Sequence, residues 1–231
     1  MPESDKNRGP ISRRAFLAGA VAVSGGLLLP LPSTAGAQSL TTTKRRGQMD
    51  IDRFVEDCVA ANSESDAQAA VAEVLAKAVH QPQSALAALG EPKAAGIDVI
   101  HRSATLTIFN ATWTPQMNLM PHNHLMWANI GIYTGREDNI MWRETPDRVE
   151  AFGAKALFEG DTAILPVDAI HSVTNPLQRF TGGIHIYGGD FFDTTRSQWN
   201  PETLDEEPSD GAVIRRIFER ENERMGNSRS S

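Results

Sequence analysis

The chain has 231 residues, of which 40% are hydrophobic and 22% are charged, and its formal net charge at pH 7 is −7. This length suffices for one well-buried core, so we expect a single domain with short appendages. The acidic balance argues against nucleic acid as a partner, because contact with phosphates needs a basic surface. The one cysteine, Cys58, excludes a framework of internal disulfides.

Residues 1–37 have the pattern of an export signal. Arg13-Arg14 precedes an apolar stretch rich in small residues, and Ala35-Gly36-Ala37 then supplies a cleavage site. The twin arginines followed by Phe-Leu resemble a twin-arginine signal, whose bacterial pathway exports folded proteins. We therefore expect the twin-arginine export machinery as a partner, a mature chain from Gln38 that is periplasmic or extracellular, and no membrane span after cleavage. The alternative is a chance arginine pair before an uncleaved signal or anchor.

Residues 38–96 are expected to form a helical segment that packs on the rest of the domain. Apolar side chains at positions 51, 54, 55, 58 and 59 follow the spacing of a buried helical stripe. Residues 65–68 have the pattern of a capping box before an Ala-, Leu- and Val-rich stretch. Pro82 begins a third short segment, which ends near Gly90.

Residues 97–192 have the pattern of a β barrel. Short stretches rich in β-branched and aromatic residues are separated by turn residues, a spacing that indicates an all-β sandwich or barrel. The expected strands are residues 106–113, 126–133, 139–144, 148–152, 162–167, 169–173 and 180–187. Residues 193–231 are expected to form a C-terminal extension, with a short charged helix over 211–224 and a disordered end.

Four of the six histidines form a pattern within this expected barrel. His122 and His124 are one residue apart, and residues i and i+2 of a strand point to the same face. Both can therefore reach one metal ion if a third ligand, such as His171, arrives from another strand. Imidazole is a ligand of iron, copper, nickel and zinc. The alternative for the first two residues alone is a pair of surface histidines.

Two segments resemble the conserved motifs of the cupin superfamily. The second cupin motif is matched with every spacing kept, and the first is matched with a glutamate ligand missing. The matching positions are Gly160, Pro166, Asp168 in place of glycine, His171 and Asn175 for the second motif, and Gln116 in place of glycine, His122, His124, Ala128 in place of glutamate and Gly135 for the first. The resemblance implies a mainly β protein with the cupin double-stranded β-helix, a jelly-roll barrel, capped by the N-terminal helices. It also implies that the metal ligands are His122, His124 and His171.

A third segment resembles the thiol dioxygenases, a cupin group with three histidine ligands. Their signature Ser-x-His-x-Tyr is matched by His185 and Tyr187, while Gly183 replaces the serine. A bacterial branch of predicted metal-dependent double-stranded β-helix proteins is also similar. The resemblance implies Fe(II), a small thiol of the cysteine or 3-mercaptopropionate type, O2 and a sulfinic acid product, with His185 and Tyr187 as catalytic residues. Loss of the serine implies one hydrogen bond fewer beside His185. The alternative is that His185 and Tyr187 only pack in the core.

An acidic thiol needs a cation, and guanidinium pairs with carboxylate through two hydrogen bonds. The resemblance makes Arg196 and Arg102 the candidates for substrate binding. Other interpretations remain open: another divalent transition metal, a cupin enzyme of another substrate class, or a cupin that binds a metal or ligand without catalysis.

Overall fold

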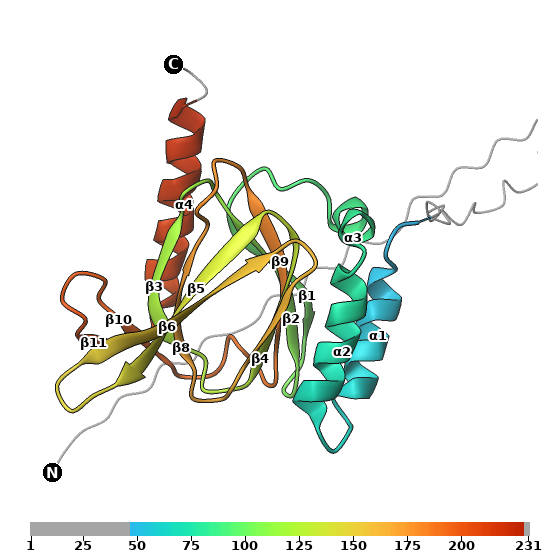
Figure 1. Ribbon diagram of the computed structural model, residues 1–231, viewed down its shortest axis with the longest axis horizontal. Helices are drawn as coiled ribbons and strands as arrows, with labels where there is room; N and C mark the ends of the chain where they lie inside the picture. Colours follow the sequence, from blue (N-terminus) through green and yellow to red (C-terminus); the bar gives the residue numbers. More distant parts are fainter. Residues whose placement is uncertain (1–46, 229–231) are drawn as a thin grey trace, which may run out of the picture. The chain divides into compact units, whose positions relative to one another are not determined.

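The computed structural model describes residues 47–228, so the expected export signal and the last three residues lie outside the described residues. Four helices and eleven strands follow one another along this part of the chain (Figure 1). They are α1 (Ile51–Ala61), α2 (Ala67–Val79), α3 (Pro82–Leu89), β1 (Gly96–Arg102), β2 (Thr107–Trp113), β3 (Asn118–Asn123), β4 (Ala128–Thr134), β5 (Arg136–Glu144), β6 (Val149–Phe158), β7 (Thr162–Leu165), β8 (Ile170–Thr174), β9 (Thr181–Tyr187), β10 (Ser197–Trp199), β11 (Glu206–Pro208) and α4 (Gly211–Ser228).

The strands form two antiparallel sheets. One has the order β1-β2-β9-β4-β7, and the other has the order β11-β10-β3-β8-β5-β6. Strands β2 to β9 thus supply four neighbours to each sheet, β2-β9-β4-β7 and β3-β8-β5-β6, which is the strand order of an eight-stranded jelly roll. This confirms the predicted fold class, a mainly β double-stranded β-helix with helices near the N-terminus.

Strand β9 is buried on both of its faces, which explains its composition. All seven of its residues are buried. Ile184 and Ile186 pack in a cluster with residues of α1, α2 and α3, whereas Tyr187 belongs to the cluster between the sheets. The alternation along the strand therefore separates a helix-covered face from a barrel interior.

No helix within residues 47–228 is long and apolar enough to cross a membrane.

The second helix begins with a different cap from the predicted one. Asp66 is the N-cap of α2, and its carboxylate accepts a hydrogen bond from the backbone N–H of Ala69. Gln68 does not close a capping box. Its amide donates instead to the carbonyl oxygens of Ala128 and Leu165, at 3.3 and 2.8 Å. The polar side chain therefore fastens α2 to strands β4 and β7.

Three of the four motif positions that correspond to cupin glycines have left-handed backbone. Gly135 and Gly160 have φ values of 82° and 88°, and Gln116 has φ 60° where the motif has glycine. Left-handed backbone costs a non-glycine residue roughly 1–2 kcal/mol. Gln116 therefore keeps the turn geometry of the motif although it is not a glycine, whereas Asp168 does not have left-handed backbone.

Part of the C-terminal extension joins the barrel, which the sequence did not predict. Strand β10 pairs with β3, with Gln198 opposite His122. Helix α4 continues past the predicted residue 224 to Ser228. Its Phe218 is buried and stacks on Trp113, with ring centroids 5.7 Å apart. Strand β10 has only three residues, too few for a periodic pattern to reveal it.

Candidate metal centre

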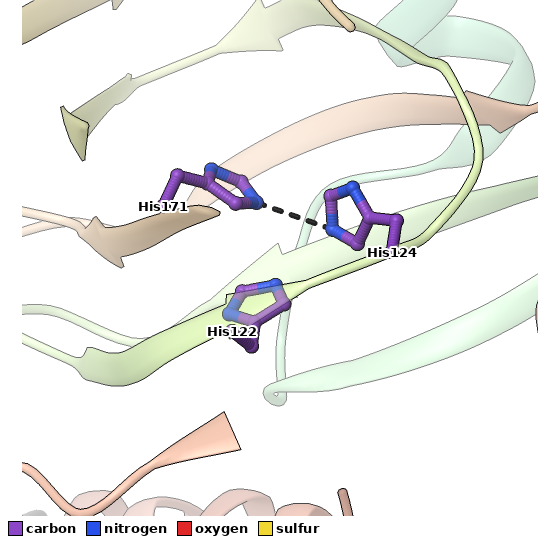
Figure 2. Close-up of side chains that lie close together, drawn as sticks. All are labelled: His122, His124 and His171. Carbon is purple, nitrogen blue, oxygen red and sulfur yellow. Dashed lines mark hydrogen bonds between the residues drawn. The ribbon is translucent and has the colours of Figure 1, made fainter. Parts of the chain in front are cut away.

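Three histidine rings meet inside the barrel (Figure 2). His122 in β3 and His171 in β8 are directly opposite each other in the antiparallel register, and His124 follows β3. Each ring can offer one nitrogen to a common point, and these three atoms lie within 4.8 Å of one another. The structure thus brings together the three residues that the sequence predicted as metal ligands, in a group that can hold a divalent metal ion.

His124 reaches this cluster in a different way from the predicted one. Strand β3 ends at Asn123, so strand alternation alone does not place both rings. Leu125, the residue that follows His124, has φ 52° and is half exposed. Such left-handed backbone at a bulky residue persists only where the surroundings hold it. The ring centroids of His122 and His124 lie 5.1 Å apart.

The hydrogen bonds of the rings leave their Nε2 atoms available. His122 Nδ1 lies 3.0 Å from the carbonyl oxygen of Met120, and His171 Nδ1 lies 2.6 Å from Asn139 Oδ1. A ring nitrogen that faces an oxygen acceptor carries the proton, so Nε2 keeps its lone pair. The Nε2 atoms of His171 and His124 are 3.2 Å apart. Metal–nitrogen bonds of about 2.1 Å at right angles place two ligand nitrogens about 3 Å apart, so this spacing fits adjacent positions on one ion.

Burial keeps the three imidazoles neutral. It lowers the pKa of His122 to about 4 and the pKa values of His124 and His171 well below the usual range. Neutral imidazole is the form that binds a metal. The Nδ1 atom of His124 is buried without a hydrogen-bond partner. The Nε2 atoms of His124 and His171 face each other within the cluster, and neutral nitrogen donors of this kind fit a bound divalent cation.

His185 and Tyr187 approach the cluster from the opposite sheet. Both are 3% exposed, and His185 Nδ1 lies 3.3 Å from the Tyr187 hydroxyl oxygen. The Tyr187 ring packs edge-on against the His124 ring, with centroids 4.9 Å apart. Burial raises the pKa of Tyr187 above its ordinary value, so the phenol keeps its proton. The structure therefore brings this predicted pair to the histidine cluster.

A buried carboxylate, Glu137, lies beside His185 and was not predicted. Its Oε2 atom is 3.2 Å from His185 Nε2, although the ring is turned away from ideal hydrogen-bond direction. Oε2 also accepts a hydrogen bond from Trp113 Nε1 at 2.8 Å, and Oε1 accepts one from Asn139 Nδ2 at 3.0 Å. Glu137 is wholly buried. Burial raises the pKa of its carboxyl group, but His185 and the hydrogen bonds outweigh this effect and leave the pKa below the ordinary value.

Glu137 fills the place of the missing serine partner. A Cβ atom added at Gly183 would lie 3.4 Å from His185 Nε2, the same ring nitrogen that faces Glu137. The hydrogen bond expected to be lost beside His185 is not replaced, because Nε2 has no hydrogen-bond partner, but Glu137 supplies a carboxylate neighbour 3.2 Å away. Only strand alternation hints at this residue. Glu137 and Asn139 share one face of β5, while Arg136 pairs with Asp138 on the opposite face.

The two predicted arginines have different surroundings. Arg196 lies in the cavity wall, with its guanidinium carbon 3.7 Å from the centroid of Phe191. Its Nε donates to the carbonyl oxygen of Thr194, and burial lowers its pKa. Arg102 does not line the cavity, because its side chain is half exposed and pairs with Asp190 at 2.8 Å. Of the two predicted arginines, Arg196 therefore faces the cavity and Arg102 is not among its lining residues.

A cavity of about 520 Å³ connects these groups. Its polar lining includes His122, His171, His185, Tyr187 and Arg196. Most of the remaining wall is aromatic or aliphatic and comes from both sheets and from α4. The apolar lining residues include Phe109, Trp113, Leu119, Phe191, Ile214 and Phe218. An apolar cavity with a few converging polar groups is typical of a small-molecule site.

No protein-family model matches the chain, and a search of curated proteins found no match. Solved structures that are similar in fold include cupins and other double-stranded β-helix proteins. A protein with a double-stranded β-helix domain from Klebsiella pneumoniae is 11% identical, with 52% of this chain and 89% of that chain covered and a TM-score of 0.35. An RmlC-like cupin family protein from Methanocaldococcus jannaschii is 9% identical, with 44% and 85% covered and a TM-score of 0.36.

An oxalate oxidase in complex with the substrate analogue glycolate is also similar, at 10% identity, with 42% of this chain and 52% of that chain covered and a TM-score of 0.36. Similarities of this size concern the fold alone. The fold assignment therefore rests on the strand topology, and the chemistry of the site rests on its own residues.

Proposed function

We propose that the chain is a mononuclear non-haem iron thiol dioxygenase. It would add both atoms of O2 to the sulfur of a thiol and yield a sulfinic acid, so that RSH and O2 become RSO2H. The observation that carries the proposal is the convergence of three histidines beside a cavity that also presents Tyr187 and Arg196. Resemblance to the Ser-x-His-x-Tyr signature supports the choice of substrate class.

The donor set suits Fe(II), although other divalent transition metals also accept imidazole. When bound, Fe(II) would leave positions open for the substrate and O2 and would favour the thiolate over the thiol. His122, His124 and His171 would hold the ion, with the first and last rings oriented by Met120 and Asn139. Without a glutamate at position 128, three neutral ligands leave the full charge of the ion in the barrel.

The other polar groups of the cavity would orient the substrate. Arg196 can pair with a substrate carboxylate, because its terminal nitrogens have no ion-pair partner among the described residues. Tyr187 would present its hydroxyl group to the substrate while His185 holds it. Phe109, Phe191 and Tyr187 stack together and limit the access of water to this part of the cavity.

The size of the cavity favours a carboxylate thiol with an apolar substituent. Cavities of about 300–1,000 Å³ usually hold ligands larger than one amino acid, and this one has about 520 Å³. Cysteine and 3-mercaptopropionate would fill only part of it. A compound such as 2-benzyl-3-mercaptopropionate keeps the same thiol and carboxylate and adds a ring for the apolar wall.

Oxygen consumption by the iron-loaded chain from Gln38 tests this proposal. We expect uptake and a sulfinate product with cysteine, 3-mercaptopropionate or its 2-benzyl derivative, and no uptake without thiol. His124→Ala should abolish both iron binding and uptake, whereas His80→Ala, at an exposed histidine, should change neither. Protein that holds one iron per chain yet consumes no oxygen with any thiol would contradict the proposal. A cupin enzyme of another substrate class, or a cupin that binds without catalysis, would then be favoured.

A further inference from the structure

We propose that Glu137 is a positioning residue that sets the tautomer of His185 and, through it, the direction of the Tyr187 hydroxyl. The inference rests on the proposed function in one respect, namely that Tyr187 faces a substrate. Its observations are independent of that function. They are a wholly buried carboxylate, its two hydrogen-bond donors and the histidine between that carboxylate and the tyrosine.

The neighbours of Glu137 show that its carboxylate only accepts hydrogen bonds. The indole nitrogen of Trp113 carries a hydrogen and has no lone pair to offer, so Oε2 must accept from it. Asn139 directs its oxygen at His171 and therefore its amide nitrogen at Oε1. Each carboxylate oxygen thus accepts a hydrogen bond, an arrangement that favours the ionised form of Glu137.

This arrangement determines which nitrogen of His185 carries the proton. Nε2 lies 3.2 Å from Oε2 outside ideal hydrogen-bond direction, and the negative carboxylate beside it favours the tautomer with its hydrogen on Nε2. Nδ1 then has a free lone pair and accepts the hydrogen bond from the Tyr187 hydroxyl at 3.3 Å. The lone pairs of the Tyr187 oxygen are left to face the cavity. Tyr187 therefore accepts a hydrogen bond from a substrate thiol or amine. The opposite tautomer would turn the tyrosine into a donor toward the cavity.

The Glu137 carboxylate in this way orients side chains from both sheets. Glu137 lies on β5 of one sheet, and His185 lies on β9 of the other. Through Asn139, the same carboxylate also orients the ring of His171. A serine at position 183 would offer His185 a neutral hydroxyl. Glu137 offers an acceptor with no hydrogen, so it specifies the tautomer more strictly than a hydroxyl, which can either accept or donate.

Nitrogen NMR of the histidine rings tests the inference directly. The full chain is labelled with ¹⁵N-histidine and loaded with zinc, which is diamagnetic and binds imidazole. The His185 signals are identified by their loss in His185→Gln. We expect wild-type His185 to be the Nε2–H tautomer, with Nδ1 unprotonated. A wild-type His185 protonated at Nδ1 alone would overturn the inference without any substitution at Glu137.

Substitution at Glu137 adds a second readout. In Glu137→Gln we expect loss of the pure Nε2–H tautomer and, at saturating iron, a turnover about 10–100-fold lower, the usual range for a group that orients a ligand or its neighbour. Glu150→Gln, a half-exposed carboxylate on β6, should leave both readouts unchanged. Retention of the wild-type tautomer in Glu137→Gln would overturn the inference.

Gly183→Ser provides a rescue. A side chain at position 183 reaches towards His185 Nε2, and only the flexible end of Ile132 is closer than 3 Å to the added Cβ. In the Glu137→Gln background, the serine should restore part of the Nε2–H tautomer and of the turnover. Absence of any recovery would count against a role through His185. If wild-type protein oxidises no thiol, the proposed function fails, while the NMR result still decides the role of Glu137.

Discussion

The Nδ1 atom of His171 lies 2.6 Å from the Oδ1 atom of Asn139 in the barrel interior. Asn139 is 2% exposed, and its amide nitrogen donates in turn to Glu137. The side chain of a metal-binding histidine is commonly held in this way by an acceptor behind its ring. Asn139 therefore connects the histidine cluster of one sheet to the His185–Tyr187 pair of the other.

Replacement of Asn139 should weaken metal binding while the cluster itself stays intact. Asn139→Leu keeps the volume but removes the acceptor for His171 and the donor for Glu137. We expect a metal affinity about 10–100-fold lower and a free energy of unfolding reduced by about 1–3 kcal/mol, because two buried groups lose a partner.

Titration of the purified chain with zinc or iron, together with urea denaturation, would measure both effects. Asn118→Leu is the matched control, because this asparagine is exposed at the start of β3. Equal metal affinities for Asn139→Leu and the parent protein would show that His171 needs no such support.

The buried histidines predict that acid destabilises the metal-free protein. The pKa of His122 is about 4 in the folded chain, against 6.5 for an exposed histidine. Between these values the unfolded chain binds a proton that the folded chain does not, so stability falls as the pH decreases from about 6.5 and the loss for His122 is complete near pH 4. The loss from this residue alone is about 3 kcal/mol. His124 and His171 shift in the same direction and extend the loss to lower pH.

Urea denaturation between pH 8 and pH 4, with a chelator present, would measure this dependence. His122→Gln should show a weaker decline than the parent protein, because the substituted side chain does not titrate. His80→Gln should show the same decline in the free energy of unfolding as the parent protein, because the side chain of His80 is exposed. A free energy of unfolding that stays constant from pH 8 to pH 4 would contradict the prediction.

The motif spacings predicted the barrel and the histidine cluster because they encode turns and strand partners. Gly135 and Gly160 have left-handed backbone at the turns, and the distance from His122 to His171 along the chain places them opposite each other on neighbouring strands. Two local motifs of one fold can therefore predict a contact between residues that are 49 positions apart, such as His122 and His171. The three helical segments were equally visible, since buried stripes such as that of Phe54 and Cys58 follow the helical period.

Glu137 could not be recognised in the same way. It lies between two charged residues, Arg136 and Asp138, in a segment that has the composition of an exposed strand edge. Its burial depends on Trp113, 24 residues earlier, and on His185 from the other sheet. Helix α4 presents a similar case. Its sequence is mostly charged and polar, so nothing in it indicates that its one aromatic residue, Phe218, stacks on Trp113. Both features arise from packing between elements, which no local period encodes.

We propose that residues 1–37 are a twin-arginine export signal, and transport should then depend on Arg13-Arg14. In a bacterium with a twin-arginine pathway, Arg13→Lys/Arg14→Lys should leave the precursor uncleaved in the cytoplasm, because the pathway reads the arginine pair itself. The parent chain should appear in the periplasm or medium with Gln38 as its first residue. Cell fractionation and N-terminal sequencing would measure both. The second pair, Arg45→Lys/Arg46→Lys, lies beyond the cleavage site and is the matched control. Normal export of the first variant would contradict the prediction.

Arg196 and Arg102 should differ in their effect on a carboxylate thiol. Arg196 faces the cavity and Arg102 is occupied by Asp190, so only the first can bind a substrate carboxylate without breaking an ion pair. Loss of a hydrogen-bonded ion pair of this kind removes about 1.5–3 kcal/mol. Arg196→Gln should therefore lower kcat/KM for 3-mercaptopropionate by about 10–100-fold, mainly through KM, whereas Arg102→Gln should leave it within about twofold.

Cysteamine distinguishes charge recognition from a general packing defect, because it has the thiol but no carboxylate. The ratio of kcat/KM values for 3-mercaptopropionate and cysteamine should fall in Arg196→Gln and stay constant in Arg102→Gln. Arg196 also packs on Phe191 at 3.7 Å, and loss of this packing would affect both thiols alike. An equal decrease for the two substrates would therefore assign Arg196 to the cavity wall, and the carboxylate would need another partner.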